Sequence, residues 1–178
     1  MINLSKRKKE IFGLILIVFS ILTIISLIGH DSTINPHGVS LEEQAKNTLG
    51  RLGVWVSYYH FITLGYLSIA FPIIFSIIGY TMVANREIST IVRPVFYIFI
   101  VLIYLSILMG LIGYLSNNNV FDKYLTGILG QSLFVFINHH LGLFGTLVFL
   151  LISFIVIVTG IFEITIQDFF VKFFSILK

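Results

Sequence analysis

Long apolar runs without Asp, Glu, Lys or Arg alternate with short polar segments along this chain. A hydrocarbon core of about 30 Å needs about 20 helical residues. Four runs reach that length, at residues 11–29, 54–84, 95–115 and 141–162. Because these runs are apolar on every face, they predict helices rather than the alternating strands of a barrel. The predicted fold class is all-α: a polytopic membrane protein whose four transmembrane helices form one bundle over residues 11–163.

The second run is longer than a bilayer requires. We expect it either to tilt or to begin outside the hydrocarbon, and we place Trp55, Tyr58, Tyr59 and His60 at the interface. No internal repeat and no soluble domain is expected.

Three shorter elements are predicted between or after the spans. Ser40 and Glu43 have capping-box spacing, which predicts a short helix in the first loop. Residues 124–137 are apolar at helical spacing but too short to span, so an interfacial or re-entrant helix is expected there. Residues 164–178 predict an amphipathic helix or the start of a linker. Its apolar side holds Ile166, Phe169, Phe170, Phe173 and Leu177, and its polar side holds Thr165, Asp168, Lys172 and Ser175.

The placement of charge predicts the orientation. Hydrophobic residues make up 57% of the chain and charged residues 11%, far from the balance of a soluble domain. Most Lys and Arg lie in residues 1–10, in the short loop with Arg86 and Arg93, and in the C-terminal tail. Both termini are therefore predicted to be cytoplasmic. The first run exceeds a signal-peptide core and no Ala-x-Ala-like site precedes His30, so an anchor is favoured over a cleaved signal.

Catalytic chemistry has little support in the sequence. It contains no P-loop, no His-Glu-x-x-His, no Gly-x-Ser-x-Gly and no cysteine, so no catalytic residue, metal or cofactor is predicted. His139 and His140, with Asn138 before them and His30 and His37 in another loop, make a zinc site conceivable. Adjacent side chains on a helix point in different directions, which favours an interfacial polar cluster instead. His60 is an ionisable group near the membrane, where a proton or ligand role is the alternative to an interfacial one.

Small residues mark helix-packing positions. They comprise Ser106, Gly110 and Gly113 in the third run, Gly65, Ser68, Ser76 and Gly79 in the second, and Gly142 and Gly145 in the fourth. Packing within one subunit is favoured over contact between protomers. Arg93 and Glu163 are interpreted as boundary residues, with an intersubunit ion pair as the alternative.

Glycines in a fixed order carry a resemblance to a known family. The matching segments are residues 10–14 (EIFGL), 26–31, 47–55 (NTLGRLGVW, with Gly50, Gly53 and Trp55), Gly65, Pro72, Gly79, 126–130 (TGILG, with Gly127 and Gly130), 141–145 (LGLFG) and 159–160 with Gly160. The chain resembles the N-terminal four-span membrane domain of the FtsK/SpoIIIE DNA translocases of bacterial cell division. Two departures are the short Asp31-Ser32 in the first loop and Phe162-Glu163 where the family has Trp.

The resemblance implies a membrane anchor at the division septum. Its implied partners are the lipid bilayer, further copies of the chain in a homo-oligomer and other septal membrane proteins. Nucleic acid would be reached only through a motor domain that lies outside this sequence. Two alternatives are a small transporter or channel subunit that uses His60, and a motor-less membrane assembly factor.

Overall fold

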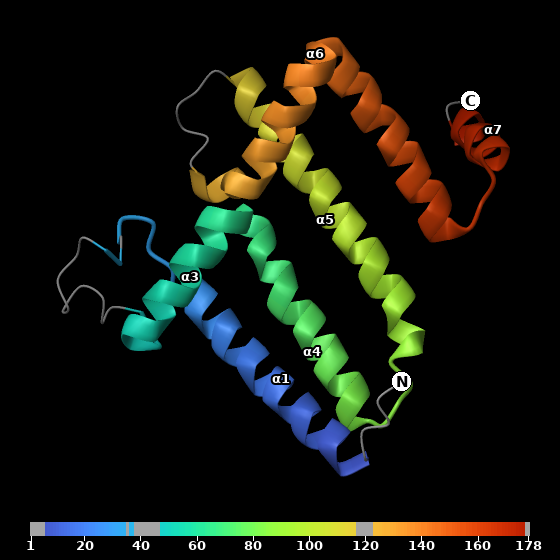
Figure 1. Cartoon of the computed structure of the whole chain (residues 1–178). Helices are drawn as coiled ribbons and strands as arrows, with labels where there is room; N and C mark the ends of the chain where they lie inside the picture. The colour runs from blue at the N-terminus through green and yellow to red at the C-terminus, as the bar shows by residue number, and fades with distance from the viewer. Residues whose placement is uncertain (1–5, 35, 38–46, 117–122, 177–178) are drawn as a thin grey trace.

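The computed structural model describes residues 6–34, 36–37, 47–116 and 123–176, except for the side chains at 123–125, 170, 172–174 and 176. Its helices are α1 (Lys6–Ile28), α3 (Gly50–Leu64), the 3-10 helix η1 (Gly65–Ile69), α4 (Ala70–Val83), α5 (Ser89–Ser116), α6 (Lys123–Phe162) and α7 (Ile166–Ile176) (Figure 1). Within these residues there is no strand, and four helical stretches are long and apolar enough to cross a membrane. The predicted all-α, polytopic fold class is confirmed.

Glycines bend two of these stretches sharply. Gly65 ends α3 with φ 64° and ψ −155°, and α6 has similar breaks at Gly127 (φ 65°, ψ 164°) and Gly142 (φ 65°, ψ 176°). Only glycine adopts this backbone region without strain. We call residues 128–141 the crossing part of α6 and residues 143–162 its spanning part. Gly65 and Gly142 are called the elbows.

The long second run therefore does not form one straight tilted helix. After the Gly65 elbow, η1 and α4 return along α1, whereas α3 lies across the end of the bundle (Figure 1). That this run begins outside the hydrocarbon stays a prediction. The predicted helix at 124–137 corresponds to the crossing part of α6, and α7 occupies most of the predicted tail helix. The capping box at 40–43 lies outside the described residues.

The fold consists of two similar halves. In each, a span leads to a shorter crossing helix, a glycine elbow turns the chain, and a second span returns: α1, α3 and α4 in the first half, α5 and the two parts of α6 in the second. Both returning spans end in the same C-terminal turn, with Asn85 and Glu163 at φ 53°. Arg86 N donates to Thr81 O at 3.0 Å, and Ile164 N donates to Thr159 O at 3.2 Å. These bonds are the six-to-one bond of a Schellman cap.

The backbone conformations follow this repeat residue by residue. Among the described residues, all positive-φ positions fall into three pairs: Gly50 with Gly127, Gly65 with Gly142, and Asn85 with Glu163. The sequence offset is 77 for the two glycine pairs (127 minus 50, 142 minus 65) and 78 for the last (163 minus 85). The prediction that the chain has no internal repeat was wrong, because the shared residues are few and mostly glycine.

The two spans of each half pack together differently. In the first half Gly13 and Gly79 bring the backbones of α1 and α4 into contact. In the second half Ile107 and Leu111 of α5 form a buried cluster with Phe134 and Leu150 of α6. The halves lie in a row (Figure 1), where Phe71 of α4 meets Phe99 of α5 with ring centroids 5.7 Å apart.

Four buried hydroxyl groups inside the bundle are satisfied by their own helices. Ser20, Thr23, Thr81 and Thr146 are buried, and each donates to the carbonyl four residues earlier on its own helix at 2.7–2.9 Å. Such bonds meet the requirement that polar groups in lipid find an internal partner.

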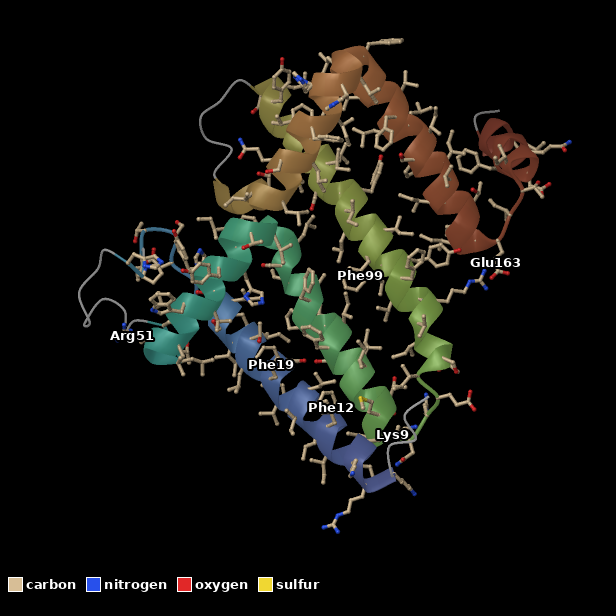
Figure 2. The ribbon with its side chains drawn as sticks, in the orientation of Figure 1. Lys9, Phe12, Phe19, Arg51, Phe99 and Glu163 are labelled. Atoms are coloured by element: carbon tan, nitrogen blue, oxygen red, sulfur yellow. The ribbon has the colours of Figure 1, made fainter. Side chains whose placement is uncertain are left out.

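Charge separates the two ends of the bundle. One end, the basic end, carries Lys6 to Lys9 at the start of α1, then Arg86 and Arg93. The other, the elbow end, carries Arg51, the elbows and the crossing helices. Figure 2 labels Lys9 and Arg51 at these opposite ends.

Candidate functional site: the elbow end

The two halves are joined at the first elbow. A Cβ atom added to Gly127 would lie 2.5 Å from Gly65 N and 2.6 Å from both Leu64 C and Thr63 O. The backbone at Gly127 thus packs directly against the backbone at Gly65, and no side chain fits between the two. We call this contact of the start of the crossing part of α6 with the Gly65 elbow the joint.

Because the two halves repeat, the elbow and the helix start that form the joint each have a counterpart in the other half. Gly142 is the counterpart of the Gly65 elbow, and Gly50 is the counterpart of Gly127. Apart from its chain neighbours and its own helix backbone, a Cβ atom at either position would have no atom of the described residues within 4 Å. Within the described structure, one component of each kind is engaged in the joint and one is open.

A buried asparagine clamps the first loop onto this end. Asn47 Nδ2 donates to Ser26 O at 3.0 Å and to Gly29 O at 2.8 Å, and Leu49 N donates to Asn47 Oδ1 at 3.0 Å. Ser26 Oγ in turn donates to Gly53 O at 2.6 Å. In the second half, Gly130 is the counterpart of Gly53 and packs closely against Ser106. A Cβ atom added to Gly130 would lie only 2.8 Å from Ser106 O.

Aromatic rings gather on α3 beside this clamp. His37 lies edge-on to Trp55 with centroids 4.9 Å apart, and its Nε2 is 2.9 Å from the Tyr59 hydroxyl oxygen. Tyr58 packs edge-on against Tyr59 at 5.5 Å. Rings of this kind suit a membrane interface or a rigid contact surface. We call these four residues the aromatic cluster.

The crossing part of α6 carries a shallow groove of about 470 Å³, lined by Gln131, Ser132, Val135, Phe136, His139 and His140. His140 Nδ1 donates to Phe136 O at 2.8 Å, and the two histidine rings lie 5.3 Å apart. The other histidines lie on the first half. His30 stacks on Phe61 at 4.3 Å, and His60 Nδ1 donates to Val56 O at 2.8 Å.

In the described part of the chain, no group of three or more His, Asp or Glu side chains is placed so that it could hold a metal ion. His60 lies on α3, bonded to its own helix, rather than within one of the straight spans.

The remaining predicted packing residues take several environments. Gly79 meets Gly13, Gly110 lies against Phe134, and Pro72 and Ser68 are fully buried. A Cβ atom added to Gly160 would lie 3.3 Å from the Tyr97 ring. Gly53 is covered by Asn47, Gly145 meets Leu141 of its own turn, and Gly113 and Ser76 are half-buried. Trp55 belongs to the aromatic cluster.

Arg93 and Glu163 form an ion pair within the chain at the basic end, with 2.6 Å between Nη1 and Oε1. They border a cavity of about 430 Å³ between α5 and α6, which is also lined by Pro94, Tyr97, Val101 and Ile161. Figure 2 shows Glu163 at the end of the spanning part of α6.

Sequence reasoning missed the partners of several residues that it selected. Gly13 was not singled out as a packing residue, although a Cβ atom added to it would lie 2.6 Å from Gly79 O. The cap of α7 was also missed: Thr165 Oγ1 accepts from Asp168 N at 3.1 Å and donates to Asp168 Oδ2 at 2.7 Å. A Thr-x-x-Asp pattern before an apolar helix is a signal that could have found it.

Comparison with known proteins agrees with this architecture. Residues 5–174 match the family described as the 4TM region of DNA translocase FtsK/SpoIIIE. Neither a search of curated proteins nor one of solved structures gave a match to the chain. The match spans both halves and all four spanning stretches. The chain therefore belongs to the family of FtsK/SpoIIIE four-transmembrane regions and is a multi-pass membrane protein.

Proposed function

We propose that this chain is the membrane anchor of a DNA translocase, which holds a cytoplasmic motor at the division septum. The observation that carries the proposal is the family match over residues 5–174, on a fold in which both halves are built from membrane-spanning hairpins. The motor and its ATP chemistry belong to a separate domain.

Charge supports an orientation with the basic end in the cytoplasm. Lys6 to Lys9, Arg86 and Arg93 gather at that end, whereas Arg51 is at the elbow end. Positive residues stay on the cytoplasmic side of bacterial membranes. The elbow end then faces outward.

Helix α7 supports a membrane-surface link toward the motor. It begins at Ile166, directly after the Glu163 turn at the basic end, and Thr165 caps it. Ile166 and Phe169 lie at helical spacing on its apolar side. A short amphipathic helix of this kind lies flat on the inner leaflet.

The aromatic cluster supports contact with other septal proteins. His37, Trp55 and Tyr59 are held together by ring contacts and by the 2.9 Å hydrogen bond between His37 Nε2 and the Tyr59 hydroxyl. They therefore offer a pre-ordered surface at the outward end. Preordered aromatic groups cost little entropy on binding.

Orientation is tested by labelling, since the native chain has no cysteine. Thr48→Cys at the elbow end should react with a membrane-impermeant maleimide on intact cells, whereas Ser89→Cys at the basic end should react only after lysis. The reverse pattern would contradict the proposal.

The anchor role is tested by the localisation of a fluorescent fusion. A fluorescent fusion of this chain should gather at septa, and a matched fusion to an unrelated four-span protein should spread over the whole membrane. The gene should also continue in frame beyond Lys178 into a Gly-x-x-x-x-Gly-Lys-Ser/Thr motif. Uniform fluorescence of the native chain, or a stop codon in place of the motor, would argue for a different role.

A further inference from the structure

We infer that a second copy of this chain docks on the Gly142 elbow through the start of its own α3, so that protomers join head to tail by the same contact that joins the two halves. The surface is defined by the Gly142 elbow on one copy and by Gly50 on the next.

The sequence around the joint is shared between its used and unused components. With an offset of 77, Gly50, Leu52, Gly53, Leu64 and Gly65 coincide with Gly127, Leu129, Gly130, Leu141 and Gly142. The shared residues are those of the helix start and of the elbow, the two components of the joint. The rest of these helices differs.

Exposure separates the used components from the open ones. At the helix start, Leu129 is 37% exposed beside the occupied joint, whereas its counterpart Leu52 is 77% exposed. At the elbow, Gly65 is buried and Leu67 half-buried, whereas Gly142 is exposed and Phe144 is 80% exposed. Each open residue thus has the exposure expected of a joint surface whose partner has been removed.

The open components cannot meet within one chain. In Figure 1, α3 and the crossing part of α6 follow one another along the row of hairpins, so the start of α3 and the bend in α6 lie at opposite ends of that row. One protomer therefore presents a helix start at one end and an elbow at the other. Surfaces that differ but complement each other produce heterologous, head-to-tail assembly rather than a two-fold dimer.

Local geometry favours backbone contact at this surface. The Gly142 elbow and Gly50 have φ values of 65° and 59°, as the joint glycines do, and neither carries a side chain that would hold a neighbour away.

The absence of cysteine permits a direct test by crosslinking in native membranes. Thr63 and Ile128 flank the joint, and their counterparts are His140 and Arg51. The double variant Arg51→Cys with His140→Cys, treated with a short bismaleimide, should give a ladder of dimers, trimers and larger species. Each single variant alone should remain monomeric, because a head-to-tail contact never brings two copies of one position together.

Three control variants show whether the crosslinks form at the proposed surface. Thr63→Cys with Ile128→Cys should crosslink within the chain, which is seen when a protease site inserted between Arg86 and Glu87 no longer separates the halves. Arg51→Cys with Arg86→Cys places the two cysteines at opposite ends of the bundle and should give no ladder. Adding Gly50→Asn, which tolerates positive φ but adds a side chain, should remove the ladder while leaving the joint crosslink intact.

Three outcomes would overturn the inference: no ladder although the joint control crosslinks, a dimer from His140→Cys alone, or crosslinking of Arg51→Cys to His140→Cys within a single chain. None of these bears on septal localisation, so this inference and the proposed function can fail separately.

Discussion

The two halves have the same path but reach different degrees of closure. In the first half the Gly65 elbow is covered, the loop is clamped by Asn47, and the spans touch through Gly13 and Gly79. In the second half the Gly142 elbow is open, and the spans are held apart at the basic end by Tyr97 beside a cavity of about 430 Å³. A repeat can thus be closely packed in one copy and more open in the other, and the more open copy is the one next to α7.

The largest expected effect separates the covered joint from the open elbow, which are represented by Gly127 and Gly142 of α6. Gly127→Ala combines strain from positive φ with a clash against the Gly65 backbone, so we expect a loss of about 3 kcal/mol or more in the free energy of unfolding. Gly142→Ala is the matched control, which adds only the strain of about 1–3 kcal/mol in a monomer. Unfolding in mixed micelles at low protein concentration measures both. Equal losses would show that the joint contributes nothing to stability.

The span contacts come next. At Gly79 an added Cβ would lie 2.7 Å from Gly13 O, a backbone atom that cannot move alone, so Gly79→Ala should cost about 2 kcal/mol. At Gly160 the nearest atom is in the Tyr97 ring at 3.3 Å, which can turn aside. Gly160→Ala should therefore change the free energy of unfolding by less than about 0.5 kcal/mol. A larger loss at Gly160 would mean that the second half is as tightly packed as the first.

How far the sequence predicted these features depends on their physics. Apolar runs identified the spans, because lipid imposes about 20 uncharged residues on a helix regardless of partners. The bend at Gly65 was not visible, since an uncharged run looks the same whether it is straight or turned. The predicted fourth span begins at residue 141, and α6 breaks at Gly142.

The partner of each small residue could not be predicted either. Gly79 and Gly142 are both glycines in apolar surroundings, yet one meets backbone and the other is open. Only the arrangement of the helices distinguishes a glycine needed for close approach from one needed for its φ. The repeat was hidden for the same reason, as a shared backbone conformation requires few shared residues.

The loop clamp gives a smaller effect that is specific to the first half. Asn47→Ala removes the donor to Ser26 O and Gly29 O, and it leaves these carbonyls without that partner. We expect a loss of about 1–2 kcal/mol. Asn47→Asp is the control, because it retains the acceptor for Leu49 N but lacks the amide donor, and it should be nearly as harmful. Hydrogen exchange should rise at α3 in both variants while α6 stays protected; uniform exchange would contradict a local clamp.

The ion pair at the basic end gives the smallest expected effect. Arg93 and Glu163 are 63% and 64% exposed, so solvent screens their attraction despite the 2.6 Å separation. Glu163→Gln should change the free energy of unfolding by no more than about 0.5 kcal/mol, with the difference vanishing at high salt. A loss that persists at high salt would indicate that the pair orders the second half at its open end.

The buried hydroxyls that bond back to their own helices have a consequence for membrane energetics. Ser20, Thr81 and Thr146 each donate their hydroxyl proton to a carbonyl of the same turn. A span can therefore carry these hydroxyls into lipid without needing a polar partner on another helix. The choice of neighbour is then left to the shape of the helix surfaces rather than to hydrogen bonds at these positions.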